Sequence, residues 1–308
     1  YATGILKTPV LGTAEAGRVR YLDLGFFRGG EPGTERVLVP QVLAPLAGWR
    51  AAGADKRSFG HVFIVGGSRS FPGAVLMTVL AALRSGAGLV TAFVPESVAA
   101  AFAARAPEAM WVAWPETPAG GLALEGEHLL REKLDRADAL VIGPGLGREK
   151  ETLALAESIV GRSEIPLVID ADALQPEIVR AGKAPRVLTP HVGEYKRIAG
   201  DAELIAFAHE VHGAVVLKGN GTRIASGDAI HRSFFGGPVL SRGGSGDLLS
   251  GIIGGLVARE KDIVLAAAQG VAWHGLAADA LARARGEVAV TTTELLDYLS
   301  PALREVRA

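Results

Sequence analysis

The chain of 308 residues carries 32 Lys and Arg against 33 Asp and Glu, and 49% of it is hydrophobic. This charge balance lacks the basic surplus of nucleic-acid-binding proteins, and no run reaches the ~20 apolar residues of a membrane span. The absence of cysteine excludes disulfides, thiolate metal sites and a cysteine nucleophile. We therefore expect a cytoplasmic globular protein that binds neither nucleic acid nor membrane.

Short apolar runs alternate with helical patterns along most of the chain. The runs predict strands at 61–65, 89–94, 139–142, 167–169, 186–188 and 214–217, followed by a hairpin of 223–225 and 229–233. Apolar spacing predicts helices at 73–85, 96–104, 150–160, 194–199, 202–211, 246–258 and 263–285, and a last one from about Thr293. Continuous apolar strands between helices predict a doubly wound α/β fold, a mostly parallel sheet with helices on both faces.

The first 35 residues differ from the rest of the chain. They are rich in Gly and Pro and contain one predicted strand, Arg18–Leu24. This is too little to fold alone, so we interpret residues 1–35 as an appendage and residues 36–308 as the main domain. Because the chain begins with Tyr rather than Met, we expect it to be part of a longer product or a processed form.

A glycine turn followed by an apolar helix, Arg242–Gly251, is the most informative pattern. Backbone N–H groups and the dipole at a helix start bind phosphate and stabilise charge during phosphoryl transfer, so Gly244, Ser245 and Gly246 are predicted to form an anion hole. Asp247 would repel phosphate unless it takes a proton from an attacking hydroxyl, which makes it the candidate general base. The alternative is that Asp247 only caps the helix.

The other distinctive motifs also follow predicted strands. They are Gly66–Ser68, Gly143–Gly147, Asp170 with Asp172, Thr189–Glu194 and Lys218–Thr222. The last is not a Walker A sequence, but its N–H groups, hydroxyl and ammonium suit a polyphosphate. Because ligands of open α/β sheets bind beyond the carboxyl ends of the strands, these motifs predict one shared site.

Several polar residues near these motifs allow two interpretations. Asp170 and Asp172 could hold Mg²⁺ through water, although a helix cap is the better interpretation of Asp172. Glu194 is either the first-turn acid of a helix or a water-mediated metal anchor. His191 could contact a ligand or lie in the core, whereas His274, within an apolar helix, is predicted to be a core histidine.

The order of these motifs resembles that of the ribokinase-like NAD(P)HX dehydratases. The resemblance runs from about residue 36 to 305 and rests on VGGS with FPGA, LRSGAGLVT, GPGLG, TPHVGE, KGNGT and GGSGDLLSGIIGG. It implies an enzyme that uses ADP or ATP, with Mg²⁺, to repair hydrated NADH and NADPH. In that reaction the hydroxyl is phosphorylated and phosphate then leaves. The resemblance also implies a homo-oligomer, with a tetramer favoured.

The resemblance assigns roles to individual residues. The positions that contact the hydrated dinucleotide correspond to Ala74, Gly145, Gly147, His191 and Asp247. The positions that contact the adenine nucleotide correspond to Lys218, Gly219, Asn220, Gly221, Thr222 and Gly246. On this interpretation His191 lies across the site from the donor loop. Phe71, Val192 and Ser245 replace the usual Tyr, Pro and Thr, and none of these changes removes a reacting group.

Two further hypotheses compete with the dehydratase. A kinase of a small alcohol, such as a hydroxymethylpyrimidine, would share the fold and the anion hole, but Thr189–His191 and Gly143–Gly147 favour the dehydratase. A non-catalytic nucleotide-binding module is disfavoured by the intact Asp247. The appendage, from Thr3 to Gly25, resembles the last strand of an NAD(P)HX epimerase domain, which implies a bifunctional parent protein. The sequence leaves open the choices of ADP or ATP and of NADHX or NADPHX.

Overall fold

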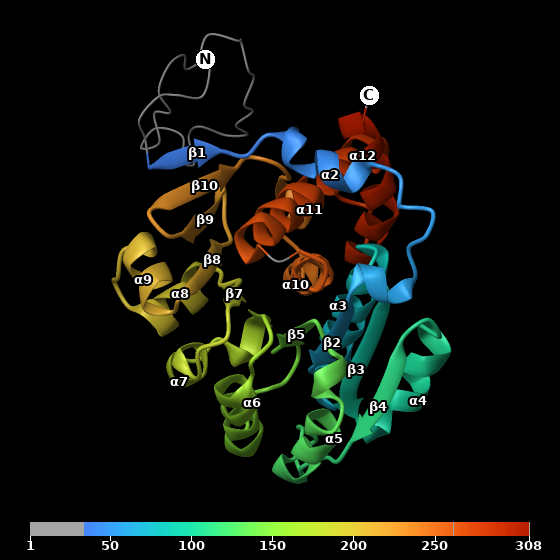
Figure 1. Ribbon diagram of the computed structural model, residues 1–308, viewed down its shortest axis with the longest axis vertical. Helices are drawn as coiled ribbons and strands as arrows, with labels where there is room; N and C mark the ends of the chain where they lie inside the picture. The colour runs from blue at the N-terminus through green and yellow to red at the C-terminus, as the bar shows by residue number, and fades with distance from the viewer. Residues whose placement is uncertain (1–33, 261, 308) are drawn as a thin grey trace.

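A single sheet runs through the described part of the molecule in the order β1-β10-β9-β8-β7-β6-β5-β2-β3-β4 (Figure 1). The computed structural model describes residues 34–260 and 262–307. The strands are β1 Glu35–Val37, β2 His61–Val65, β3 Leu89–Pro95, β4 Met110–Trp114, β5 Ala139–Ile142, β6 Leu167–Ile169, β7 Arg186–Leu188, β8 Gly213–Leu217, β9 Thr222–Ser226 and β10 Ala229–Ser233.

The centre of the sheet is parallel, as the sequence predicts. Every neighbouring pair from β4 to β8 is parallel, and the predicted hairpin is the antiparallel pair β9–β10. The chain winds outward from β2 to β4 and then returns to the other side of β2 with β5. The carboxyl ends of β2 and β5 therefore flank a topological switch point, where open α/β sheets bind their ligands.

Two strands at the edges of the sheet are absent from the sequence prediction. Within the described residues the strand β4 pairs only with β3, and its partly exposed residues do not form the continuous buried run that marks the central strands. The strand β1 pairs in parallel with β10 and begins where the appendage was predicted to end. The predicted strand Arg18–Leu24 lies outside the described residues.

Helices cover both faces of the sheet and confirm the doubly wound fold. One face packs against α3 Pro72–Arg84, α4 Glu96–Arg105, α10 Ser245–Val257, α11 Ile263–Arg285 and α12 Leu299–Arg307, with the short α2 Ala44–Ala47 beside α12. The other face packs against α5 Glu127–Arg131, α6 Lys150–Arg162, α7 Pro176–Arg180, α8 Val192–Ala199 and α9 Leu204–Glu210. Alternate residues of β2 enter the two cores, with Val62 and Ile64 in one and Phe63 and Val65 in the other.

Glycines bring α10 into close contact with its neighbours. A side chain at Gly251 would collide with the Thr78 carbonyl of α3, and one at Gly254 would collide with Val141 of β5. The repeated glycines of this helix therefore have a packing role, since they hold it tightly between α3 and the sheet. This packing fixes the position of the glycine turn at its N-terminus.

The C-terminal helices also follow the sequence prediction. The Asp262 carboxylate caps α11 by accepting hydrogen bonds from the N–H groups of Val264, at 2.9 Å, and Leu265, at 3.1 Å. The last predicted helix begins as a 3₁₀ turn, Thr292–Tyr298, with Glu294 in its first turn, and continues as α12. Within residues 34–260 and 262–307, no helix combines the length and the apolar character that crossing a membrane requires.

Candidate active site

The predicted anion hole lies at the open N-terminus of α10. Gly244 has a φ of +87°, a left-handed conformation that glycine adopts without strain. Ser245 was predicted to belong to the anion hole, but it donates its N–H to the Arg242 carbonyl, and Leu248 donates to the Gly244 carbonyl. Between them, the N–H groups of Gly246 and Asp247 have no hydrogen-bond acceptor in the described part of the chain. They are therefore available to a phosphate at the positive end of the helix dipole.

Asp247 lies in the first turn of this helix, as the sequence predicts, and is partly buried. Burial raises its pKa from 3.8 to about 7, and the negative charge of Asp170 acts in the same direction. The positive charge of Lys218 opposes this rise. A carboxylate with a pKa near neutrality can exchange a proton with a substrate hydroxyl under physiological conditions, which suits a general base.

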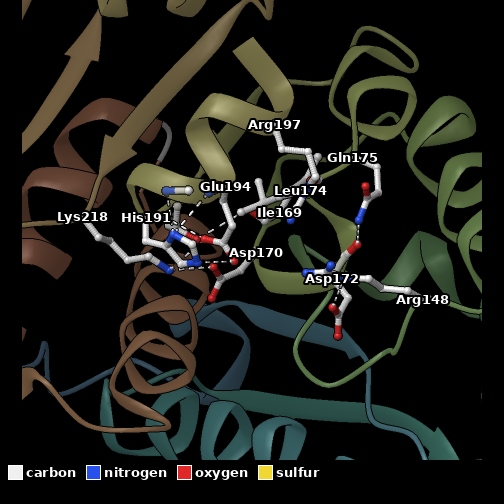
Figure 2. Close-up of polar contacts among 12 residues, drawn as sticks. Arg148, Ile169, Asp170, Asp172, Leu174, Gln175, His191, Glu194, Arg197 and Lys218 are labelled. Atoms are coloured by element: carbon white, nitrogen blue, oxygen red, sulfur yellow. Dashed lines mark hydrogen bonds and ion pairs between the residues drawn. The ribbon is translucent and has the colours of Figure 1, made fainter. Parts of the chain in front are cut away.

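Lys218 forms a partly buried ion pair that the sequence analysis did not predict. Its Nζ donates a hydrogen bond to Asp170 Oδ1 at 3.1 Å and lies 3.9 Å from Glu194 Oε2 (Figure 2). Burial alone would lower the pKa of Lys218, but the nearby charges of Asp170 and Glu194 outweigh it and raise the pKa. The ammonium is therefore held in its charged form.

The same ammonium group lies over the start of α10. A Cβ atom at Gly246 would be 3.1 Å from Lys218 Nζ and 3.9 Å from Asp170 Oδ2. The adjacent strand order β6-β7-β8 brings Asp170, which follows β6, and Lys218, which follows β8, to the same edge of the sheet. The structure thus joins the anion hole, the candidate base and a partly buried cation in one place.

The loops that carry His191 and Lys218 lie side by side. Their backbones form a parallel bridge, and the Lys218 N–H donates to the Pro190 carbonyl at 2.8 Å. The prediction that His191 lies across the site from the donor loop is therefore wrong at the level of the backbone. Gly219 and Asn220 are exposed beyond this bridge, and Thr222 begins β9.

His191 and Glu194 form a reciprocal cap at the start of α8. His191 Nδ1 accepts hydrogen bonds from the N–H groups of Gly193, at 2.9 Å, and Glu194, at 3.2 Å, while Glu194 Oε2 accepts one from the His191 N–H at 2.8 Å. Of the two interpretations of Glu194, the first-turn acid describes its structural role. The His191 side chain remains 60% exposed, which leaves its ring accessible to a ligand.

The end of the Gly143–Gly147 loop is hydrogen-bonded to Asp172. Asp172 accepts hydrogen bonds from the Gly147 N–H at 3.0 Å and from Arg148 Nε at 3.1 Å (Figure 2). The prediction that Asp172 caps a helix is wrong, because its carboxylate turns away from the local 3₁₀ turn toward this loop. At Gly145, φ is +68°, and an added Cβ would be 3.1 Å from the Ala74 Cβ. The loop and the start of α3 are therefore in contact.

His274 is a buried histidine of α11, as predicted, with a partner in the anion hole. Its Nε2 lies 3.5 Å from Ser245 Oγ. Burial lowers the pKa of His274 to about 4, so the ring is neutral at physiological pH. The sequence analysis did not predict this contact, because the two residues are 29 positions apart.

Comparisons with known proteins agree with this arrangement. A family model described as NAD(P)H-hydrate dehydratase matches residues 62–301. The chain is 39% identical over 273 residues to the bifunctional NAD(P)H-hydrate repair enzyme Nnr of Moorella thermoacetica, covering 83% of this chain and 52% of the relative. It is 37% identical over 258 residues to the ADP-dependent (S)-NAD(P)H-hydrate dehydratase of Xanthomonas campestris, covering 80% and 88%. The chain thus spans about half the length of the bifunctional relative.

Solved structures show the same fold. A ribokinase-like protein from Enterococcus faecalis matches with a TM-score of 0.78 and 26% identity, over 91% of this chain and 99% of that one. The ADP/ATP-dependent NAD(P)H-hydrate dehydratase of Bacillus subtilis, co-crystallised with ATP and Mg²⁺, matches with a TM-score of 0.72 and 28% identity, over 84% and 94%. The fold is therefore ribokinase-like, and the chain belongs to the NAD(P)H-hydrate dehydratase family.

Proposed function

We propose that this domain removes water from hydrated NADH or NADPH at the expense of ADP or ATP. The observation that carries the proposal is Asp247, a carboxylate with a pKa near neutrality at a helix start with free N–H groups. A phosphoryl group bound there would lie beside a base that can activate the attacking hydroxyl. The family membership supports the same reaction.

The proposed reaction has two steps. Asp247 takes the proton of the substrate hydroxyl while its oxygen attacks the terminal phosphorus, and the bond from that phosphorus to the nucleotide breaks, leaving AMP from ADP or ADP from ATP. The N–H groups of Gly246 and Asp247 and the Lys218 ammonium stabilise the charge on the phosphoryl group. The C–O bond then breaks, phosphate departs with the electron pair, and the neighbouring ring carbon loses a proton to restore the double bond.

We assign the ligands to two sides of this centre. The hydrated dinucleotide would contact Ala74, Gly145, Gly147 and His191, and the adenine nucleotide would lie along Lys218–Thr222. Support for the first group comes from the contact between the Gly145 turn and the start of α3. Support for the second comes from the exposed Gly219 and Asn220, next to the Lys218 ammonium.

Mg²⁺ fits this site as a partner of the phosphates. Mg²⁺ is usually held by one or two carboxylates, several waters and substrate phosphates. Asp170 and Glu194, the carboxylates beside the Lys218 ammonium, would hold the ion, and Glu194 would act through a water. When bound, the ion would neutralise charge on the transferring phosphoryl group.

The alternative of a small-alcohol kinase is less well supported. The hydroxyethylthiazole kinase of Pyrococcus horikoshii matches at 19% identity and a TM-score of 0.53, which establishes only a shared fold.

We further propose that the parent protein carries an epimerase domain, as the bifunctional relatives suggest. We expect the protein to be cytoplasmic and to form a homo-oligomer, with a tetramer favoured. Light scattering of the purified protein measures the mass of the assembly.

The experiment that tests this function is direct. Chemically prepared NADHX is incubated with the protein and ADP, ATP or no nucleotide, and the absorbance of reformed NADH is followed. We expect NADH to form only with a nucleotide, and the Asp247→Asn variant to be inactive. Phosphorylation of a small alcohol, with no NADH formed under any condition, would establish the kinase instead.

A further inference from the structure

An open cleft lies at the carboxyl ends of β3 and β4, outside the site described above. It has a volume of about 650 Å³ and is lined by Arg69, Glu96, Ser97, Glu116, Thr117 and Pro118. These residues come from the loop after β2, the start of α4 and the loop after β4. The mechanism proposed above uses none of them.

The cleft lies at the same edge of the sheet as the expected position of the dinucleotide. Three strand spacings separate the end of β6 from the end of β3, which places the cleft about 14 Å from Asp170. The loops at the switch point, Gly66–Ser68 and Gly143–Gly147, lie between them, and a Cβ at Gly147 would be 3.8 Å from Ser68 Oγ. The ribose–diphosphate–ribose chain of a dinucleotide can span this distance.

The start of α3 suits the diphosphate on this path. The residue before the helix, Phe71, provides no side-chain cap, and Pro72 occupies the first turn. The first-turn N–H groups of Gly73 and Ala74 therefore face no local acceptor, at the positive end of a helix of 13 residues. Arg69 precedes this helix start by three residues and Ala74 lies in its first turn, so one extended ligand can contact both.

The charges in the cleft are mostly negative. Arg69 Nη2 pairs with Glu116 Oε2 at 2.7 Å, and Glu116 Oε1 accepts a hydrogen bond from the Ser97 N–H at 2.8 Å. Burial acts to raise the pKa of Glu116, but its hydrogen bonds to Ser97 and Arg69 outweigh burial and lower the pKa. The Glu116 carboxylate is thus ionised and neutralises the only arginine of the cleft. The exposed Glu96 has no ion-pair partner in the described part of the chain, which leaves a net negative charge.

We infer that this cleft binds the adenosine ribose of the hydrated dinucleotide and selects NADHX over NADPHX, an inference that rests on the proposed function. A carboxylate can accept hydrogen bonds from the free 2′-hydroxyl of NADHX. The 2′-phosphate of NADPHX would instead place its negative charge next to Glu96 and Glu116. In Rossmann-fold proteins an arginine near the ribose accommodates the 2′-phosphate, whereas here Arg69 is already paired with Glu116.

The test compares the two hydrates at saturating ADP or ATP. We expect a higher kcat/KM for NADHX in the unaltered protein and a shift of about tenfold toward NADPHX in Glu96→Lys, since the change replaces a repulsion with an attraction. Glu108→Lys is the matched control, because Glu108 is exposed and lies before β4, at the opposite end of that strand. Inhibition by the products NADH and NADPH should shift in the same way.

Two results would overturn the inference. One is equal kcat/KM for both hydrates in the unaltered protein, and the other is the same shift in Glu96→Lys and Glu108→Lys. Both require nucleotide-dependent turnover and leave the proposed function intact. If neither hydrate is converted with ADP or ATP, the proposed function itself fails.

Discussion

Replacing Asp247 with asparagine should abolish turnover and yet stabilise the folded protein. The pKa of Asp247 in the folded protein, about 7, lies above its ordinary value of 3.8. The folded state therefore loses stability as the pH rises from about 4 to 7 and the carboxylate ionises, and the full loss remains above pH 7. A difference of roughly three pKa units corresponds to on the order of 4 kcal/mol. Because asparagine cannot ionise, Asp247→Asn should recover most of this free energy at pH 8 and almost none at pH 4.

Thermal unfolding of both proteins between pH 4 and pH 8 measures this effect. The Tm of Asp247→Asn should exceed that of the unaltered protein by several degrees at pH 8, while activity falls by ~10²–10⁴. Asp201→Asn is the matched control, because Asp201 is exposed, and it should show no such pH dependence. A Tm difference that is the same at both pH values would refute the argument from burial. Near-normal turnover would refute the assignment of Asp247 as the base.

Further variants test the surroundings of Asp247. In pH–rate profiles, kcat/KM should rise with pH to a plateau above about pH 7, as Asp247 ionises. Lys218→Ala should move this rise to higher pH, because Lys218 lowers the pKa of Asp247. Asp170→Asn should move it to lower pH, because Asp170 raises that pKa. Gly244→Ala should lower Tm and activity together, because its φ is +87° and a Cβ would collide with Met77. His191→Ala should raise the KM for the hydrate and leave the KM for ADP nearly unchanged. His191→Asn keeps a good helix cap, so a higher KM in this variant too would come from lost ligand contact and not from lost capping. ADP or ATP at a hundredfold excess over Kd should stabilise by about 2.7 kcal/mol, seen as a higher Tm.

The sequence predicted the fold well because buried parallel strands have a clear pattern. The runs at 139–142 and 167–169 are continuous and apolar, and they are strands with those bounds. The edge strand β4, Met110–Trp114, is also an unbroken apolar run, but the sequence analysis did not assign it, and its partial exposure reflects its place at the edge of the sheet. For the site, the pattern placed Asp247 at a helix start. It could not supply the Lys218–Asp170 pair, because these residues are 48 positions apart and meet only through the strand order.

The Lys218–Asp170 pair explains how a buried carboxylate can serve as a base near neutral pH. Burial and the charge of Asp170 raise the pKa of Asp247, whereas the charge of Lys218 lowers it. Asp170 and Lys218 are hydrogen-bonded to each other, so their charges lie close together. Their effects on the pKa of Asp247 therefore oppose each other. Burial can then set the pKa near 7 while the cation stays beside the anion hole for the phosphoryl group. In the proposed mechanism, Asp170 and Lys218 would thus tune the pKa of Asp247, and Lys218 would also stabilise the charge of the phosphoryl group.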